Sequence, residues 1–145
     1  IKLHLVGKLQ TNKVKLAIKI FDYIHSLDSE KLAKKIADEQ IKQNKKLKIF
    51  IQINIGNEVQ KSGINKQDVV KFYEYCKNLH LDIIGIMCIP PKGEMSLNYF
   101  LEMNKINTEL NLTGLSMGMS EDYLEAAKNN ATFLRIGSKI FGERN

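Results

Sequence analysis

The chain has 145 residues, 43% of them hydrophobic, which is enough for one domain with a buried core and too few for two large ones. No run of about 18 apolar residues and no signal peptide is recognisable, which argues against a membrane-spanning or secreted class. The net charge is +6, but its source is 20 lysines spread over helical patterns plus two arginines near the end. This pattern predicts a solvated surface and neither a nucleic-acid nor a membrane partner.

The two cysteines, Cys76 and Cys88, do not have the spacing of metal ligands. Cys88 lies in an apolar stretch and reads as a small buried hydrophobic residue. We therefore expect a reducing, cytoplasmic compartment and no metal site.

Short apolar runs alternate with segments of helical spacing along the whole chain. Strands are predicted at residues 2–6, 23–27, 47–55, 81–89, 114–117 and 132–136. Helices are predicted at residues 12–20, 28–40, 65–76, 96–110 and 120–128, with a short terminal helix from residue 138. Several strands are apolar on both faces, as in a parallel sheet covered by helices. The pattern predicts an α/β fold, either doubly wound or a barrel.

Two early loops carry polar residues that are suited to binding. Asn12 follows the first predicted strand, where it fits a ligand hydrogen bond or the cap of the next helix. Lys61 lies in a polar loop after the third strand, within reach of a phosphate or an aldehyde, although most loop lysines bind neither. His25 and His80 suggest no catalytic role, and no acid–base pair follows from spacing. No catalytic residue is predicted.

Glycine and serine recur at the last two junctions between a strand and a helix. In the segment 115–120, Gly118 permits a tight turn, and Met119 and Ser120 can aim backbone N–H groups and a hydroxyl at an anion. Gly137 and Ser138 repeat the arrangement after the sixth strand. Each serine alone is an ordinary helix cap. Together the two corners predict a phosphate site, because β/α-barrels commonly bind phosphate on the loops after their last two strands.

Arg135 ends the sixth predicted strand. Alternation places it on the face opposite Leu134 and Ile136, so it points into the interior if those two residues meet the helices. An interior guanidinium needs an acceptor, because leaving it unpaired is very costly. The alternative is an exposed arginine paired with a surface carboxylate, and the pattern alone does not decide between them.

Five segments occur in the order found in pyridoxal phosphate homeostasis proteins, and the chain resembles that family over nearly its whole length. The segments are His4-x-x-Gly7-x-Leu9-Gln10-x-Asn12-Lys13, Lys61-Ser62-Gly63-Ile64, Gly85-x-Met87-x-Ile89-Pro90, Leu115-Ser116-Met117-Gly118-Met119-Ser120 and Arg135-Ile136-Gly137-Ser138-x-Ile140-Phe141-Gly142. The last two segments in tandem are highly specific.

The resemblance implies a (β/α)8 TIM barrel similar to the barrel domain of alanine racemase, with residues 1–145 as its single cofactor-binding domain. It implies pyridoxal 5'-phosphate as the cofactor, with its phosphate held by Met119, Ser120, Gly137 and Ser138. Arg135 would face the pyridine nitrogen, and Asn12 would lie beside the ring. The family is thought to buffer and deliver the cofactor, so apo-enzymes that use it are the implied partners.

The family attaches the cofactor to a lysine on the first strand of its barrel, ahead of the His-x-x-Gly motif, and only three residues precede His4. The resemblance therefore implies that the first two βα units and the Schiff-base lysine are absent from this chain, which leaves an open six-stranded sheet. We expect a monomer that binds and carries the cofactor without turnover. The alternative is a racemase-like enzyme, but the chain offers no candidate for the second acid–base residue that a racemase needs.

Overall fold

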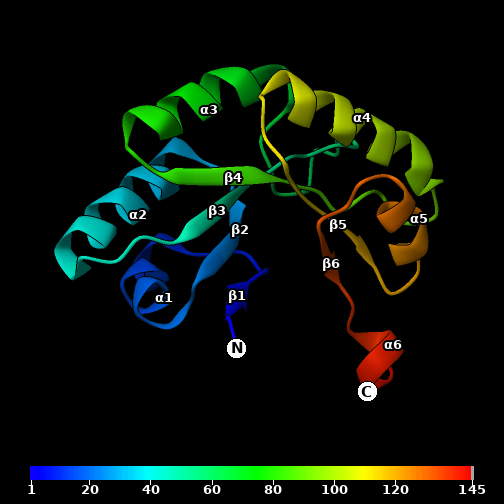
Figure 1. Cartoon of the computed structure of the whole chain (residues 1–145), viewed down its shortest axis with the longest axis horizontal. Helices are drawn as coiled ribbons and strands as arrows, with labels where there is room; N and C mark the ends of the chain where they lie inside the picture. Colours follow the sequence, from blue (N-terminus) through cyan, green and yellow to red (C-terminus); the bar gives the residue numbers. More distant parts are fainter. Residues whose placement is uncertain (145) are drawn as a thin grey trace.

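The computed structural model describes residues 1–144 and shows an α/β fold built on one parallel sheet. Within these residues the sheet has six strands in the sequential order β1-β2-β3-β4-β5-β6, and every neighbouring pair is parallel. The sheet curls into an arc with helices along its outer side, and β1 and β6 lie at the two ends (Figure 1). The predicted α/β class and the open six-stranded part of a barrel are confirmed.

Each strand is followed by a helix, as the hydrophobic pattern predicts. The strands are β1 (His4–Leu5), β2 (Tyr23–Leu27), β3 (Lys48–Gln52), β4 (Asp82–Met87), β5 (Gly114–Met119) and β6 (Phe133–Arg135). The α-helices are α1 (Val14–Ile20), α2 (Glu30–Gln43), α3 (Val69–Asn78), α4 (Ser96–Glu109), α5 (Tyr123–Lys128) and α6 (Ser138–Phe141). Two short 3-10 helices, η1 (Thr11–Lys13) and η2 (Lys66–Asp68), precede α1 and α3. No helix among the described residues is long and apolar enough to cross a membrane.

The main core fills the space between the sheet and the helices. Isoleucines of the strands meet apolar helix side chains there, and nearly all of these are fully buried. Representative members are Ile24, Ile49, Ile51, Ile86, Val14, Ile18, Ile36, Phe72, Phe100 and Met103. Burial of this apolar area is the main force that holds the helices on the sheet.

Helix α2 shows how local sequence sets the element boundaries. The Ser29 hydroxyl accepts a hydrogen bond from the backbone N–H of Leu32 at 3.2 Å, which caps the first turn. Asn44 ends the helix in the left-handed conformation, with φ of 48°. The helix predicted from residue 28 is therefore confirmed, with its first residue shifted to Glu30 by the serine cap.

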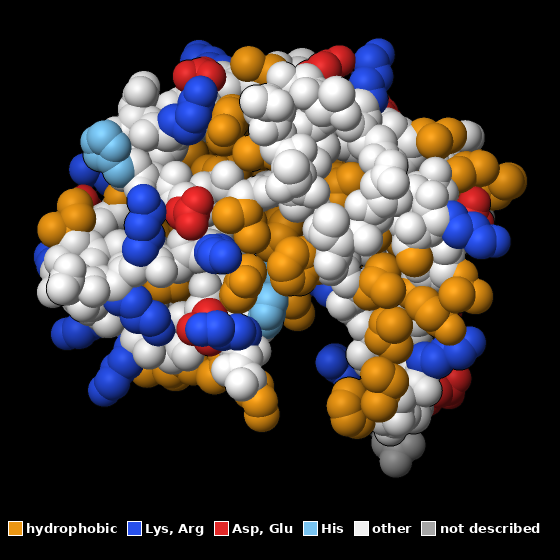
Figure 2. Space-filling view, in the orientation of Figure 1, with side chains coloured by type: hydrophobic (Ala, Val, Ile, Leu, Met, Phe, Trp, Pro, Cys, Tyr) orange, Lys and Arg blue, Asp and Glu red, His pale blue; other side chains and the backbone are white. Residues whose placement is uncertain are grey.

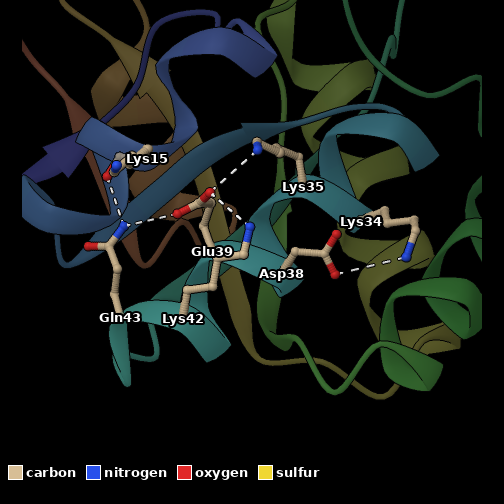
Figure 3. A network of polar contacts seen from close by, with 7 residues as sticks. All are labelled: Lys15, Lys34, Lys35, Asp38, Glu39, Lys42 and Gln43. Carbon is tan, nitrogen blue, oxygen red and sulfur yellow. Dashed lines mark hydrogen bonds and ion pairs between the residues drawn. The ribbon is translucent and has the colours of Figure 1, made fainter.

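Three lysines of α2 are paired with carboxylates of the same helix (Figure 3). Glu39, whose side chain is buried, lies 3.4 Å from the Lys35 ammonium and 3.8 Å from that of Lys42. Asp38 pairs with Lys34 at 3.9 Å. Much of the basic charge on this helix is thus matched by carboxylates three or four residues away, which fits surface lysines and not a focused anion site.

A second group of side chains lines the concave side of the sheet. Phe50 is fully buried, stacks on the His25 ring at a centroid distance of 4.4 Å, and meets the Phe133 ring edge-on at 5.2 Å. His4 stacks on Tyr23 at 4.0 Å. This face is hollowed between the N-terminal end and the C-terminal helix, with hydrophobic side chains and a histidine along the wall (Figure 2). The concave face is therefore aromatic and partly polar, whereas the outer core is mainly aliphatic.

The predicted helix start at residue 120 is wrong. Residues 120–122 form a turn, and α5 begins only at Tyr123. The Asp122 carboxylate causes this difference, because it accepts hydrogen bonds from the backbone N–H of Met119 at 2.8 Å and from the Ser96 hydroxyl at 2.8 Å. The acidic residue expected in the first turn of the helix instead closes the loop before it.

Candidate functional site

The two glycine–serine corners converge at the carboxyl ends of β5 and β6. The Ser120 hydroxyl accepts hydrogen bonds from the backbone N–H groups of Gly137 and Lys139, both at 3.2 Å. A side-chain carbon added at Gly137 would meet no atom within 4 Å, so the space beside these amides is open. The corners thus present backbone donors and one hydroxyl around a common exposed point, as an anion site requires.

Gly118 and Met119 give the first corner its shape. Gly118 has φ of +95°, and an added Cβ would lie 2.5 Å from the Cβ of Ala126. This position therefore requires glycine both for its backbone conformation and for the close approach of α5. Met119 pairs with Arg135 in the strand register, and its backbone N–H is taken by Asp122. Only the exposed side chain of Met119 therefore remains for a ligand.

Replacing Gly118 by alanine is expected to lower the free energy of unfolding by about 2 kcal/mol, because a left-handed residue and a steric clash are imposed together. Gly93 is the matched control, since it has φ of +77° but open space around its missing side chain. Gly93→Ala should cost about 1 kcal/mol, for the conformation alone. Urea denaturation measures both variants, and equal losses would contradict the role of close packing at Gly118.

Arg135 lies inside the arc, which is the first of the two orientations that the sequence pattern allows. Its Nη1 donates to the Ser116 hydroxyl at 2.7 Å, and its Nη2 donates to the backbone carbonyl of Cys88 at 2.7 Å. Among the described residues, no carboxylate forms an ion pair with it, so the exposed, paired alternative is wrong. Burial lowers the pKa of Arg135 from its ordinary value, while Cys88 and Asp122 oppose that effect. A largely desolvated cation is thus held by two neutral oxygens.

Two histidines continue this polar path across the concave face. Nδ1 of His25 lies 2.8 Å from the Ser116 hydroxyl, and Nε2 of His25 lies 3.0 Å from Nδ1 of His4. His25 is almost fully buried. Desolvation, followed by the charges of His4 and Arg135, lowers the pKa of His25 to about 3. His25 is therefore neutral at physiological pH.

Residues 2–145 match the family described as the N-terminal domain of alanine racemase. This chain belongs to that family. Its relatives include the pyridoxal phosphate homeostasis proteins of Aquifex aeolicus, 37% identical over 97% of this chain, and of Synechocystis, 36% identical over 97% of it. The chain covers 66% of the first relative and 69% of the second. It is thus a member of the pyridoxal phosphate homeostasis branch of the racemase-domain family.

PipY of Synechococcus elongatus, a solved structure, agrees with the arrangement of the elements. Its form without PLP is 32% identical and superposes with a TM-score of 0.92, and its form with PLP bound is 31% identical with a TM-score of 0.90. Each comparison covers 98% of this chain and 71% of PipY. The chain spans about two thirds of the length of the first curated relatives that it matches.

The structure places the family's other candidate residues apart from the corners. Asn12 lies in η1, exposed, and lines a surface pocket with Glu30 and Lys34 of α2. It does not form a side-chain cap of η1 or α1. Lys61 is paired with Glu58 at 2.9 Å and also contacts the carbonyl of Pro90 at 3.4 Å. The roles of Asn12, Met119, Ser120, Arg135, Gly137 and Ser138 in cofactor binding remain predictions.

Sequence reasoning missed Ser116, His25 and His4 as neighbours of Arg135 in this member of the family. Ser116 was visible only as part of a motif, and His25 appeared to have no chemical partner. One signal was available, because His4 and Tyr23 occupy paired positions in adjacent strands and His25 lies two residues further on. Residues two apart on a strand share a face, so both histidines were candidates for the same side as Arg135.

Proposed function

We propose that this chain binds pyridoxal 5'-phosphate as part of a protein that buffers and delivers this cofactor. The supporting observation is Arg135, a partly buried guanidinium beside two corners that carry hydrogen-bond donors, with no carboxylate partner among the residues described. The family relationship supports the same ligand, because relatives are named for its homeostasis and PipY was solved with it bound.

The corners fit a phosphate group. The backbone N–H groups of Gly137 and Lys139 already share one acceptor, the Ser120 hydroxyl. A phosphate has several strong acceptor oxygens and can replace or extend that hydroxyl contact. Ser138 follows Gly137 on the same exposed corner and adds a hydroxyl there. We propose Ser120, Gly137 and Ser138 as the phosphate-binding residues, with Met119 packing beside them.

Arg135 fits an aromatic nitrogen acceptor. A guanidinium has five N–H groups, and two of those in Arg135 are bonded to protein oxygens. Pyridoxal phosphate supplies a reactive aldehyde and a ring that is a strong electron sink only when its nitrogen is protonated. The permanent cation of Arg135 donates to an unprotonated nitrogen and disfavours its protonation. The side chain therefore suits retention of the cofactor better than carbanion chemistry.

The finer features of the proposal follow from this role. We propose a carrier without turnover, which passes the cofactor to apo-enzymes in a reducing, cytoplasmic compartment. Both cysteines are buried free thiols, which fits such a compartment. Desolvation raises the pKa of each thiol to about 12, so neither is a reactive nucleophile. We also propose Asn12 as a contact of the cofactor ring.

Equilibrium dialysis against pyridoxal 5'-phosphate, pyridoxal and inorganic phosphate tests the proposal directly. The chain should retain the phosphorylated cofactor more tightly than either part alone. Arg135→Glu is expected to weaken retention at least about tenfold, since a charge-assisted hydrogen bond is lost and a like charge is introduced. The control is Arg144→Glu, which makes the same charge change at the other, exposed arginine. Equal effects of the two variants, or no retention by the wild type, would reject the assignment.

A further inference from the structure

Ser116 occupies a position where the direction of every hydrogen bond can be deduced. Its side chain is fully buried on β5, between Arg135 of β6 and His25 of β2. A serine hydroxyl has one proton and two lone pairs. Arg135 is only a donor, so it occupies one lone pair of the Ser116 oxygen.

The single hydroxyl proton must then point toward His25. No other acceptor for it lies in hydrogen-bond range among residues 1–144. If Nδ1 of His25 carried a proton, the hydroxyl of Ser116 would accept twice and leave its own proton buried without a partner, which is costly. Nδ1 of His25 is therefore the acceptor in this contact.

The same accounting extends to His4. A neutral His25 with a bare Nδ1 carries its proton on Nε2, and that nitrogen lies 3.0 Å from Nδ1 of His4. His25 donates to His4, so Nδ1 of His4 is also bare. The donors then run in one direction, from Arg135 through Ser116 and His25 to His4.

We infer that Ser116, His25 and His4 are positioning residues, which form a one-directional hydrogen-bond chain that holds Arg135 ready for the ring of the bound cofactor. The identity of the ligand in this inference rests on the proposed function, whereas the hydrogen-bond chain follows from the contacts alone. Ser116 of β5 and the carbonyl of Cys88, the residue after β4, hold the guanidinium from two sides. The histidines in turn fix the proton of Ser116, which leaves its lone pair available to Arg135.

The chain responds to acid through His4, its outermost member. A proton added to Nδ1 of His4 would face the Nε2 proton of His25, and the conflict is relieved only if His25 moves its proton to Nδ1. Ser116 would then accept from both His25 and Arg135, and its own buried proton would lose its acceptor. Acid at His4 therefore weakens the hold on Arg135.

The surroundings of the chain oppose this protonation at neutral pH. Desolvation lowers the pKa of His4, and Asp22 partly opposes that effect. Tyr23 stacks on His4, with the Lys48 ammonium 5.9 Å from the Tyr23 ring, and Lys2 pairs with Asp22 at 3.8 Å.

At the other end of the hydrogen-bond chain, the charge of Arg135 lowers the pKa of His25, while the Cys88 thiol and Asp122 raise the pKa of Arg135. Phe50 and Phe133 flank His25 with apolar rings.

Nitrogen-15 NMR of the histidine rings tests the chain without any cofactor. At pH 7.5, His25 should show the tautomer with its proton on Nε2, and Ser116→Ala should release that preference. A proton on Nδ1 of His25 in the wild type would overturn the inference. This result stands whether or not the protein binds pyridoxal 5'-phosphate.

Dialysis against pyridoxal 5'-phosphate tests the link to the site. Ser116→Ala should weaken retention about fivefold, the size of one net hydrogen bond. Ser26→Ala is the matched control, because Ser26 is also buried but its hydroxyl has no hydrogen-bond partner. Retention by the wild type should fall as the pH drops below 6.5, because the pKa of His4 is lowered from that value, and this fall should flatten in Ser116→Ala. Equal retention by the two variants, or identical pH profiles of Ser116→Ala and the wild type, would reject the positioning role. A wild type that binds no cofactor would reject the proposed function instead.

Discussion

Replacing Phe50 by alanine is expected to lower the free energy of unfolding by about 4 kcal/mol, the usual cost of emptying a large aromatic site. Phe50 is fully buried on the concave face, between the rings of His25 and Phe133. It also touches the position of the missing side chain of Gly114. The backbones of β4 and β5 are closely packed at Gly114, so the neighbouring atoms are poorly able to move into the cavity.

Urea denaturation followed by circular dichroism measures this loss. Phe141→Ala is the matched control, because it is the same substitution at a residue of α6 that is 84% exposed. Its effect should be within about 0.5 kcal/mol of zero, as for ordinary surface substitutions. A small loss at Phe50 would mean that the concave aromatic group contributes little to the stability of the sheet.

Acid is expected to destabilise the fold through His25 well before the carboxylates are protonated in bulk. The pKa of His25 is about 3 in the folded protein, against 6.5 for an ordinary histidine. Between these values the unfolded state binds the proton and the folded state does not, so stability is complete above pH 6.5 and is lost as pH falls. The loss is about 1.4 kcal/mol per pH unit, or about 3 kcal/mol at pH 4.5.

Denaturant midpoints between pH 7.5 and 4.5 test this expectation. His25→Phe keeps the stacking on Phe50 and removes the titrating group, so its stability should depend much less on pH. His80→Asn serves as the control, because His80 is exposed and has φ of 57°, a conformation that asparagine tolerates. Parallel pH profiles for His25→Phe and the wild type would show that the buried histidine is not the source of acid sensitivity.

The alternation of strands and helices was predictable from sequence because their hydrophobic patterns differ. Apolar residues recur every three or four positions in the helices, whereas the buried strands are short apolar runs. The second strand was predicted with its observed bounds, and alternation gave the interior face for Arg135 as one of two alternatives. The flanking segments of β3 were overestimated. Ile53 leaves the regular ladder to form an isolated bridge with Ile64, a pairing that local sequence does not reveal.

The polar path beside Arg135 was not predictable in the same way. Alternation from Tyr23 gives the side of His25, but the register between β2 and β3 shifts between Ile24 and Leu27, so alternation does not continue along the rest of β2. The contact of Ser116 with His25 joins residues 91 positions apart, and no local pattern carries that distance. The loop before α5 depends on Asp122 reaching both Met119 and Ser96, another tertiary effect.

Arg135 reaches from β6 across Ser116 of β5 to the carbonyl of Cys88, which follows β4. One side chain thus connects the carboxyl ends of β4, β5 and β6, at the edge of the sheet where a ligand would bind. Ligand binding at Arg135 and the stability of this end of the sheet are therefore linked, because the same side chain takes part in both. Substitutions that alter the contacts of Arg135, and with them the affinity for a ligand, would therefore also alter the stability of the last three strands.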